Sequence, residues 1–221
     1  MKITELTLHC ELPAEQKRFY AQMLGFPEIE GLGGSDGFSM HAGYTRVNFV
    51  PGNADARYHF AFNIRPDQLN DAAEWIQQSG VDLLYSKNDR SIVVDFPAWK
   101  AKSLYFFDPC GNIVELIARA AIRPAGNAPR FSSASVLGIS EIGIVTEDVK
   151  SFREWIENAH GISGFHRQEN TDVFSAMGDD EGLLLIVEHK RPWLMGDFEA
   201  IHHPLAISGI HNDRDFRLIL P

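Results

Sequence analysis

Several features that would narrow the function of a protein are scarce or missing in these 221 residues. Only two cysteines occur, Cys10 and Cys110, which are too few for a disulfide framework and lack the spacing of a metal motif, so we expect incidental thiols. No apolar run approaches the roughly 20 residues that a membrane-spanning helix needs, and the N-terminal MKITELTLHC has no secretory h-region. We therefore expect a cytoplasmic protein with no membrane partner.

Positive charge is also scarce, with 20 Lys and Arg against 30 Asp and Glu and a formal net charge of −10. Residues 136–221 carry most of the excess, with 7 basic against 15 acidic side chains. Because phosphate backbones are bound by clustered basic side chains, this composition argues against a nucleic acid as partner. We interpret the acidic C-terminal part as a solvated surface.

Residues 103–118, SLYFFDPCGNIVELIA, contain two apolar runs joined by Asp-Pro-Cys-Gly, which is typical of a β-hairpin turn. The second run is apolar on both faces, yet Glu115 lies in the middle of one of them. A carboxylate buried without a partner is costly or takes up a proton, so Glu115 is expected to contact a metal, a cation or a strong donor. A three-residue loop would place Tyr105 opposite Glu115, with Ser103 two residues along on the same face.

The chain repeats one order of elements, in which a strand and a helix are followed by three strands. The predicted elements of the first two copies are a strand at 3–9, a helix from Pro13 to Gly25, strands at 37–43 and 45–51, a strand at 58–64, a helix at 66–80, and strands at 81–86 and 91–96 before the hairpin. A Pro-, Gly- and Ser-rich stretch at 121–135 is predicted to be a linker.

Beyond this stretch the same order begins again, with a strand at 139–145 and a helix from Asp148 to Gly161. Residues 202–208 have the pattern of an opening strand in an incomplete fourth copy. Five residues recur at a constant offset of 136, namely Ile3, Thr4, Glu5, Leu6 and Gly25, which match Ile139, Ser140, Glu141, Ile142 and Gly161. The chain therefore contains an internal repeat.

These elements resemble the vicinal oxygen chelate superfamily, which includes glyoxalase I, extradiol ring-cleaving dioxygenases and bleomycin-binding proteins. The matching features are the βαβββ order, FY-x-x-x-LGF at Phe19, HFAFNI at His59 and YFFDPCGNIVEL around Glu115. The resemblance implies an α+β fold, in which repeated βαβββ modules form curled mixed β-sheets, or half-open barrels, with the helices outside. It divides the chain into a two-module glyoxalase-like domain at 1–120, a linker at 121–135, and a third module with an incomplete fourth at 136–221.

The resemblance also implies a divalent metal ion, held by the first strand of each paired module and the last strand of the second. Carried onto this sequence, the metal ligands are Glu5, His59 and Glu115. A ligand set with two carboxylates suits Mn, Mg, Ni or Zn better than the Fe of a dioxygenase, although the sequence does not decide which of these five metals is bound. His9 shares a face with Glu5 but lies about 13 Å away at roughly 3.3 Å per residue, so one ion cannot bind both.

Other residues are assigned roles around this centre. Glu115 and Tyr105 are the predicted catalytic residues, because a carboxylate beside a metal can move a proton and a buried phenol needs a hydrogen-bond partner. The predicted substrate-binding residues are His9, Ser103 and Trp99, the last of which is flanked by Lys100 and Lys102.

Three functions follow. The first is a glyoxalase-like, metal-dependent lyase or isomerase acting on a small oxygen-rich molecule through a stabilised enolate or oxyanion. The second is an extradiol dioxygenase, and the third is a metal-free protein that binds a small molecule. Glu141 and His203 repeat first-strand positions, but we interpret the third copy as structural or as a cover over the substrate. The unfinished fourth copy leaves a strand edge through which two chains could pair as a homodimer.

Overall fold

The computed structural model describes residues 1–31, 36–88, 90–122, 126 and 130–221. Its first module contains β1 (Lys2–Cys10), α1 (Pro13–Lys17), the π-helical segment η1 (Arg18–Met23), β2 (Glu28–Ile29), β3 (Phe38–Ala42) and β4 (Thr45–Pro51). β1 and β4 are parallel neighbours, and β3 lies antiparallel to β4. The helix begins at Pro13, and Gly25 follows it with a φ of 74°, a conformation that glycine adopts without strain. Both limits of this helix agree with the prediction.

The second module repeats this arrangement with β5 (His59–Ile64), the 3₁₀ turn η3 (Pro66–Gln68), α2 (Leu69–Gln78), β6 (Val94–Phe96), β7 (Ala101–Phe107) and β8 (Ile113–Arg119). β5 and β8 are parallel, and β7 forms the predicted hairpin with β8. The predicted strand at 81–86 is wrong. Among the described residues, only the Leu84 N–H reaches β7, at 2.7 Å from the Tyr105 carbonyl oxygen, whereas β6 pairs with residues 101–103, the part of β7 that precedes Tyr105.

The third module contains β9 (Gly138–Thr146), α3 (Val149–His160), β10 (Phe174–Asp179) and β11 (Gly182–Glu188), preceded by the 3₁₀ turn η4 (Ser133–Ser135). The Asp148 side chain caps α3 by accepting a hydrogen bond from the Ser151 N–H, and Gly161 ends the helix in the left-handed conformation. The fourth copy is a single hairpin of β12 (Leu205–His211) and β13 (Arg214–Leu220).

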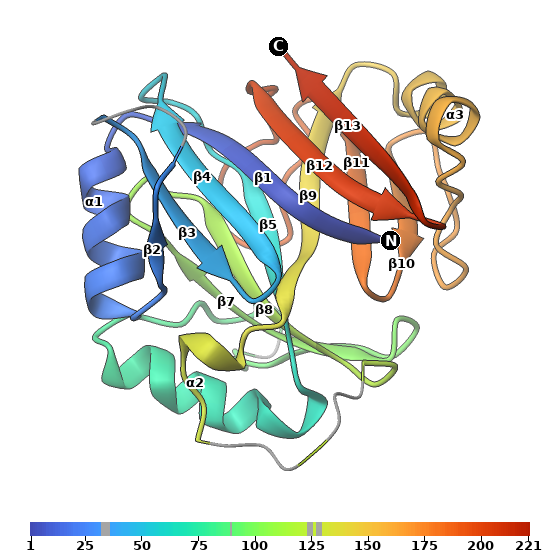
Figure 1. Cartoon of the computed structure of the whole chain (residues 1–221). Coiled ribbons are helices and arrows are strands. Elements are labelled where there is room, and N and C mark those ends of the chain that lie inside the picture. Colours follow the sequence, from blue (N-terminus) through green and yellow to red (C-terminus); the bar gives the residue numbers. More distant parts are fainter. Residues whose placement is uncertain (32–35, 89, 123–125, 127–129) are drawn as a thin grey trace.

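Within the described residues the strands form one mixed sheet, whose continuous path runs β2-β3-β4-β1-β9-β5-β8-β7-β6. β11 also pairs with β9 and carries β10, while β12 also pairs with β1 and carries β13. Figure 1 shows the sheet curling between the modules, with α1, α2 and α3 on its outside. The predicted α+β architecture of repeated modules with external helices is confirmed.

The resemblance implied that the first and second modules pair with each other, but the structure pairs each of them with a module of the C-terminal part. β5 of the second module pairs antiparallel with β9 of the third, and β1 of the first pairs antiparallel with β12 of the fourth. β1 and β9 meet only where Ile3 faces Ile139, and these two residues are equivalent in the repeat. The pairing therefore joins modules on either side of residues 121–135, while the predicted division of the chain there stays a prediction.

Each of these two inter-module pairings contains an irregularity in register at the same repeat position. The register of β1 shifts between Ile3 and Glu5, and the equivalent irregularity in β9 lies between Ile139 and Glu141. The two halves of the chain thus resemble each other in strand pairing as well as in sequence. This similarity makes it possible to compare the two inter-module junctions residue by residue.

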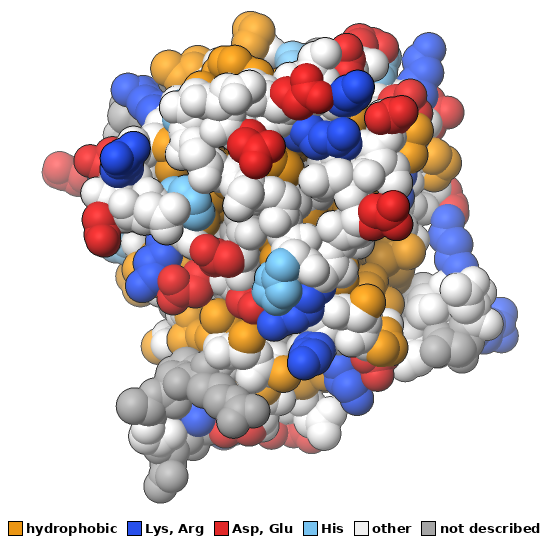
Figure 2. All heavy atoms as spheres, turned by 90° about the vertical axis from the view of Figure 1, so that its right-hand side faces the viewer, with side chains coloured by type: hydrophobic (Ala, Val, Ile, Leu, Met, Phe, Trp, Pro, Cys, Tyr) orange, Lys and Arg blue, Asp and Glu red, His pale blue; other side chains and the backbone are white. Residues whose placement is uncertain are grey.

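The outer surface carries charges of both signs. Figure 2 shows acidic and basic side chains interspersed over one face, without a broad basic area. Among the described helices, none has the length and hydropathy needed to cross a bilayer.

Candidate functional site

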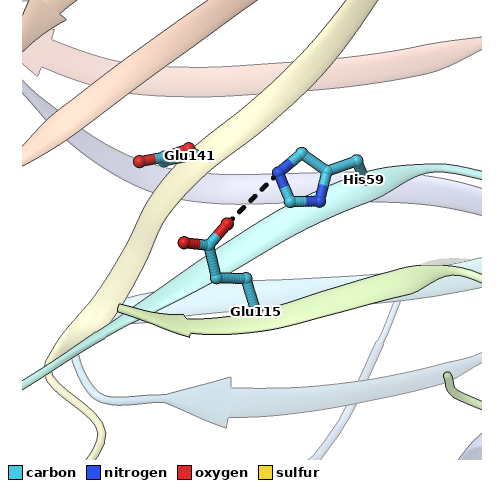
Figure 3. A group of neighbouring side chains, drawn as sticks. All are labelled: His59, Glu115 and Glu141. Carbon is cyan, nitrogen blue, oxygen red and sulfur yellow. Dashed lines mark ion pairs between the residues drawn. The ribbon is translucent and has the colours of Figure 1, made fainter. Parts of the chain in front are cut away.

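A cavity of about 260 Å³ opens between the second and third modules. Its polar floor contains His59, Glu115 and Glu141, which are drawn together in Figure 3. The walls are mainly apolar and aromatic, and the side chains that form them are Phe96, Trp99, Tyr105, Ile113, Ile117, Phe174, Leu185, Trp193, Leu194 and Met195. An apolar cavity with a few converging polar groups is the usual form of a small-molecule site.

Strand register brings the two carboxylates together. Ala61 of β5 faces Glu115 on β8 and Glu141 on β9, so the three residues form one row across three strands. Because Ala61 has no side chain beyond Cβ, the space between the two glutamates is left for their carboxylates. His59 lies two residues before Ala61 and therefore on the same face of β5. One ligand atom from each of His59, Glu115 and Glu141 can be chosen so that all lie within 4.8 Å of one another.

Glu115 has the environment that the sequence predicts. Every residue of β8 is buried, since the strand lies between β5 and β7, and the Glu115 side chain is only 2% exposed. Tyr105 faces it directly across the hairpin, so the predicted register is confirmed. Burial together with the charges of Glu115 and Glu141 raises the pKa of Tyr105 well above its usual value. The phenol therefore stays protonated at neutral pH and serves as a hydrogen-bond donor.

His59 is oriented through both of its ring nitrogens. Nδ1 lies 3.2 Å from the Ile113 carbonyl oxygen and is assigned as the donor to it, so that Nε2 points to Glu115, with 3.4 Å between Nε2 and Oε2. Burial disfavours the imidazolium, but the hydrogen bond and charge of Glu115, with a smaller effect of Glu141, raise the pKa of His59. The buried Glu115 thus has an imidazole beside it as the polar partner that a carboxylate among aliphatic neighbours requires.

Glu141 is held by Arg119, which is fully buried. The Arg119 guanidinium forms an ion pair with Glu141, donates from Nε to the Ser140 hydroxyl at 3.2 Å, and lies 4.0 Å from an Asp180 oxygen. It also lies over the Trp99 ring, 5.4 Å from the centroid. Burial and the neighbouring Glu115 charge raise the pKa of Glu141 to about 7, although Arg119 and His59 oppose this shift.

The structure brings together two of the three metal ligands that the resemblance implied, and it places the third elsewhere. Glu5 lies on β1, where its Oε1 accepts a hydrogen bond from Asn48 at 3.0 Å and lies 3.7 Å from Arg46. It is outside the group of three because β1 pairs with β12 and β4 rather than with β5. Glu141 of the third module lies with His59 and Glu115 instead, so this module contributes a side chain to the group as well as lining the cavity.

The repeat itself contained the signal that was missed. Glu141 is the residue that matches Glu5 at the offset of 136. At the β1–β12 junction, Glu5 faces Ser208 and Thr7 faces Ala206, so Ala206 takes the position that His59 has at the β5–β9 junction. The β12–β13 hairpin also supplies no counterpart of β8. Within the described part of the chain, only the β5–β9 junction therefore has all three side chains.

Of the three predicted substrate-binding residues, one lines the cavity and two do not. Trp99 lines the cavity, and its Nε1–H donates to the Gln168 side chain at 3.0 Å. Ser103 is buried and does not line it. His9 lies beside Gly52, and its backbone N–H is 3.2 Å from the Tyr58 hydroxyl, away from the cavity-lining residues. His203 contacts the Tyr58 ring, with 5.8 Å between the centroids, and is also not part of the cavity.

No protein-family model and no curated protein matches the chain in sequence. Similarity to solved structures is extensive. A proposed dioxygenase from Bacillus subtilis superposes with a TM-score of 0.63 at 14% identity, covering 99% of this chain and 84% of that protein. Two variants of glyoxalase I from Zea mays superpose with TM-scores of 0.55 and 0.52 at 13% and 14% identity, covering 85% of this chain and 68% and 67% of theirs. Identities this low establish the fold alone. The chain has the fold of the vicinal oxygen chelate superfamily, as the resemblance implied.

Proposed function

We propose that the chain is a metal-dependent enzyme in which His59, Glu115 and Glu141 hold a divalent ion at the floor of the cavity. The observation that carries this proposal is the convergence of one imidazole and two carboxylates, all buried, with ligand atoms within 4.8 Å of one another. Imidazole and carboxylate groups are ordinary ligands of Mn²⁺, Ni²⁺, Zn²⁺ and Fe²⁺, and carboxylates also bind Mg²⁺.

The surroundings of the three residues fit such an ion. The His59 Nδ1 contact with the Ile113 carbonyl oxygen leaves Nε2 as the ligating atom, which is the usual arrangement of a metal-bound histidine. Two carboxylates with the single cation Arg119 give the floor a net charge of −1 when His59 is neutral. A divalent cation would compensate this charge, which is expensive to keep in an apolar cavity.

Lyase or isomerase chemistry on a small oxygen-rich substrate agrees best with these residues. When bound, a divalent ion supplies Lewis-acid stabilisation of negative charge on two neighbouring substrate oxygens. Tyr105, protonated at neutral pH and next to Glu115, donates a hydrogen bond to the same charge. A glutamate of the floor takes up the substrate proton. The apolar walls exclude water and strengthen these interactions.

A ring-cleaving dioxygenase is the second candidate, because a protein described as a proposed dioxygenase shares the fold over 99% of this chain. The three candidate metal ligands favour a dioxygenase less than a lyase or isomerase. Non-haem iron oxygenases usually bind Fe²⁺ through two histidines and one carboxylate, whereas this floor has one histidine and two glutamates. A metal-free binding protein, in which His59 and Glu115 only pair with each other, is the third candidate.

Metal analysis separates these candidates. The protein is purified without chelator, its metal content is measured by mass spectrometry, and its melting temperature is recorded with added Mn²⁺, Ni²⁺, Zn²⁺, Mg²⁺ or Fe²⁺. The proposal expects about one bound ion per chain, or a rise in Tm with at least one metal that His59→Ala abolishes. Absence of both would leave the metal-free binding protein. Oxygen-dependent ring opening of a catechol by Fe²⁺-loaded protein would instead establish the dioxygenase.

A further inference from the structure

Arg191 has no part in the proposed metal centre, although it lines the same cavity. Among the described residues around the cavity it is the one Lys or Arg. Its position in the sequence, three residues beyond the end of β11, gave no reason to single it out. A charged side chain in a mainly apolar wall requires an explanation.

The other buried or half-buried cations near the site already have partners. Arg119 pairs with Glu141, and Arg167 lies 2.5 Å from an Asp180 oxygen. The Arg191 guanidinium instead lies over the Phe174 ring, 4.9 Å from its centroid, and no carboxylate of the described residues is within ion-pair distance. Its five N–H donors are thus available to a ligand, and a guanidinium is well suited to bind a carboxylate with two parallel hydrogen bonds.

The backbone around Arg191 is held in place, so the guanidinium starts from a defined position. Residues 190–200, which we call the strap, close on themselves through two hydrogen bonds of 2.8 Å, from Lys190 N–H to the Ala200 carbonyl and from Ala200 N–H to the Arg191 carbonyl. Lys87 holds the far end of the strap through Asp197, at 2.8 Å. Trp193 of the strap is buried beside His59, with 5.5 Å between the ring centroids.

The strand register gives the spacing between this cation and the polar floor. Trp193 packs against Gly143, which lies beside the His59 carbonyl. Phe174, under the Arg191 guanidinium, pairs with Val187, which in turn faces Val145, two residues beyond Gly143. Two residues of strand correspond to about 7 Å along the strands at roughly 3.3 Å per residue, and β10 lies two strands across from β9, roughly 10 Å at about 4.8 Å per strand. The Phe174 backbone is therefore about 12 Å from Gly143, which leaves room for one six-membered ring with an oxygen bound at one end and a carboxylate at the other.

We propose that the cavity binds a small carboxylic acid, an inference that rests on the proposed function. Its two neighbouring oxygens lie at the His59, Glu115 and Glu141 floor, its carboxylate is bound by Arg191, and a ring or short apolar chain between them packs against Phe174 and Trp193. The cavity volume of about 260 Å³ is at the small end of ligand sites, which agrees with a single-ring molecule. Arg191 is in this account a specificity-determining residue for the charged end of the substrate.

The test uses two probes that differ by one carboxylate, catechol and 3,4-dihydroxybenzoate. Their affinities for Zn²⁺-loaded protein are measured by isothermal titration calorimetry, since Zn²⁺ has no redox chemistry that would consume the probes. A charge-assisted hydrogen bond lost from a half-buried site corresponds to at least a tenfold loss of affinity. We expect Arg191→Met to weaken 3,4-dihydroxybenzoate binding at least tenfold and catechol binding less than twofold, and Arg191→Lys to recover part of the loss.

Arg214→Met, which removes an exposed cation on β13, is the matched control and should change neither affinity. Equal losses for both probes, or no loss for 3,4-dihydroxybenzoate, would overturn the carboxylate subsite. If Arg191→Met does not fold, Arg191→Gln replaces it, because Gln keeps a polar side chain beside Phe174.

A failure of the proposed function gives a different result. If Zn²⁺ does not bind, benzoate is titrated into the metal-free protein and into Arg191→Met. A benzoate affinity that depends on Arg191 would then support the subsite without the metal centre, and one that does not depend on it would overturn both.

Discussion

The substitutions Glu141→Gln and Glu5→Gln distinguish between the two junctions of the repeated modules. Both replace a glutamate at the same position of the repeat with an isosteric amide, but only Glu141 lies with His59 and Glu115. We expect Glu141→Gln to remove metal binding and Glu5→Gln to retain it. The comparison is matched in chemistry and in repeat position, so it isolates the role of tertiary structure.

The size of the expected effect follows from ligand linkage. A metal present at 100 times its Kd stabilises the folded state by about 2.7 kcal/mol. For a chain of about this length, 1 kcal/mol shifts Tm by about 2–4 °C, so saturating metal should raise Tm by about 5–11 °C. Glu5→Gln should preserve this rise, and Glu141→Gln should reduce it to less than about 2 °C.

The metal-free Tm of Glu141→Gln will also change, for a separate reason. Arg119 is 0% exposed, and the substitution leaves its guanidinium without the Glu141 charge. Loss of the ion pair is destabilising, whereas the raised pKa of Glu141 means that the folded state favours a neutral side chain at this position, so the two effects oppose each other in the metal-free Tm. The measured quantity is therefore the metal-induced shift within each variant, obtained by differential scanning fluorimetry with and without metal. A shift that survives Glu141→Gln and disappears in Glu5→Gln would refute the assignment of the site.

Three further outcomes are expected. Gly143→Ala should lower Tm and weaken ligand binding, because the new Cβ would lie 2.6 Å from the Trp193 ring and displace the strap. Melting curves measure the Tm and calorimetric titration measures the affinity, and unchanged values of both would contradict this packing. In metal-free protein, the pKa of Glu141 is raised to about 7 from an unfolded value of 4.5, so the stability that its protonated form contributes is present below pH 4.5 and is lost as pH rises through 7. The Tm of the metal-free protein should therefore fall between pH 5 and 8, while the metal-induced rise in Tm grows. If neither the metal-free Tm nor the metal-induced rise changes with pH, the raised pKa of Glu141 is contradicted. Asp108→Ala should cost about 3 kcal/mol or more, since the buried carboxylate accepts hydrogen bonds from Gln16, Tyr20 and Asn112, yet the metal-induced shift should persist in the folded variant.

Much of the local structure was predictable from short-range patterns. Pro13 and Gly25 limit the first helix, and Asp148 and Gly161 limit α3, because capping and left-handed glycine depend only on neighbouring residues. The 81–86 segment shows the limit of such reasoning. Its alternating apolar residues are buried at Val81 and Leu83, as in a strand. Among the described residues, however, a single backbone hydrogen bond, from Leu84 N–H to the Tyr105 carbonyl oxygen, joins the segment to β7, and one such bond does not make a strand.

The candidate site was only partly predictable for the same physical reason. Glu115 could be found because a carboxylate within a buried run is conspicuous in any fold, and Tyr105 could be placed opposite it from the hairpin turn. Arg119 follows Glu115 by four residues on the same strand, but its pairing with Glu141 depends on a strand from another module. Arg191 belongs to a strap without regular secondary structure, which no periodicity reveals.

The amino-acid sequence by itself determined the modules, their repeat and the buried acidic residue in the last strand of the second module, because these depend on local periodicity and turn chemistry. Only the tertiary structure decided that the second module pairs with the third, and hence that Glu141 rather than Glu5 joins His59. The two glutamates occupy equivalent strands with equivalent local sequence. They differ in the strand that hydrogen bonds to theirs, and such pairing is set by contacts between residues far apart in the chain.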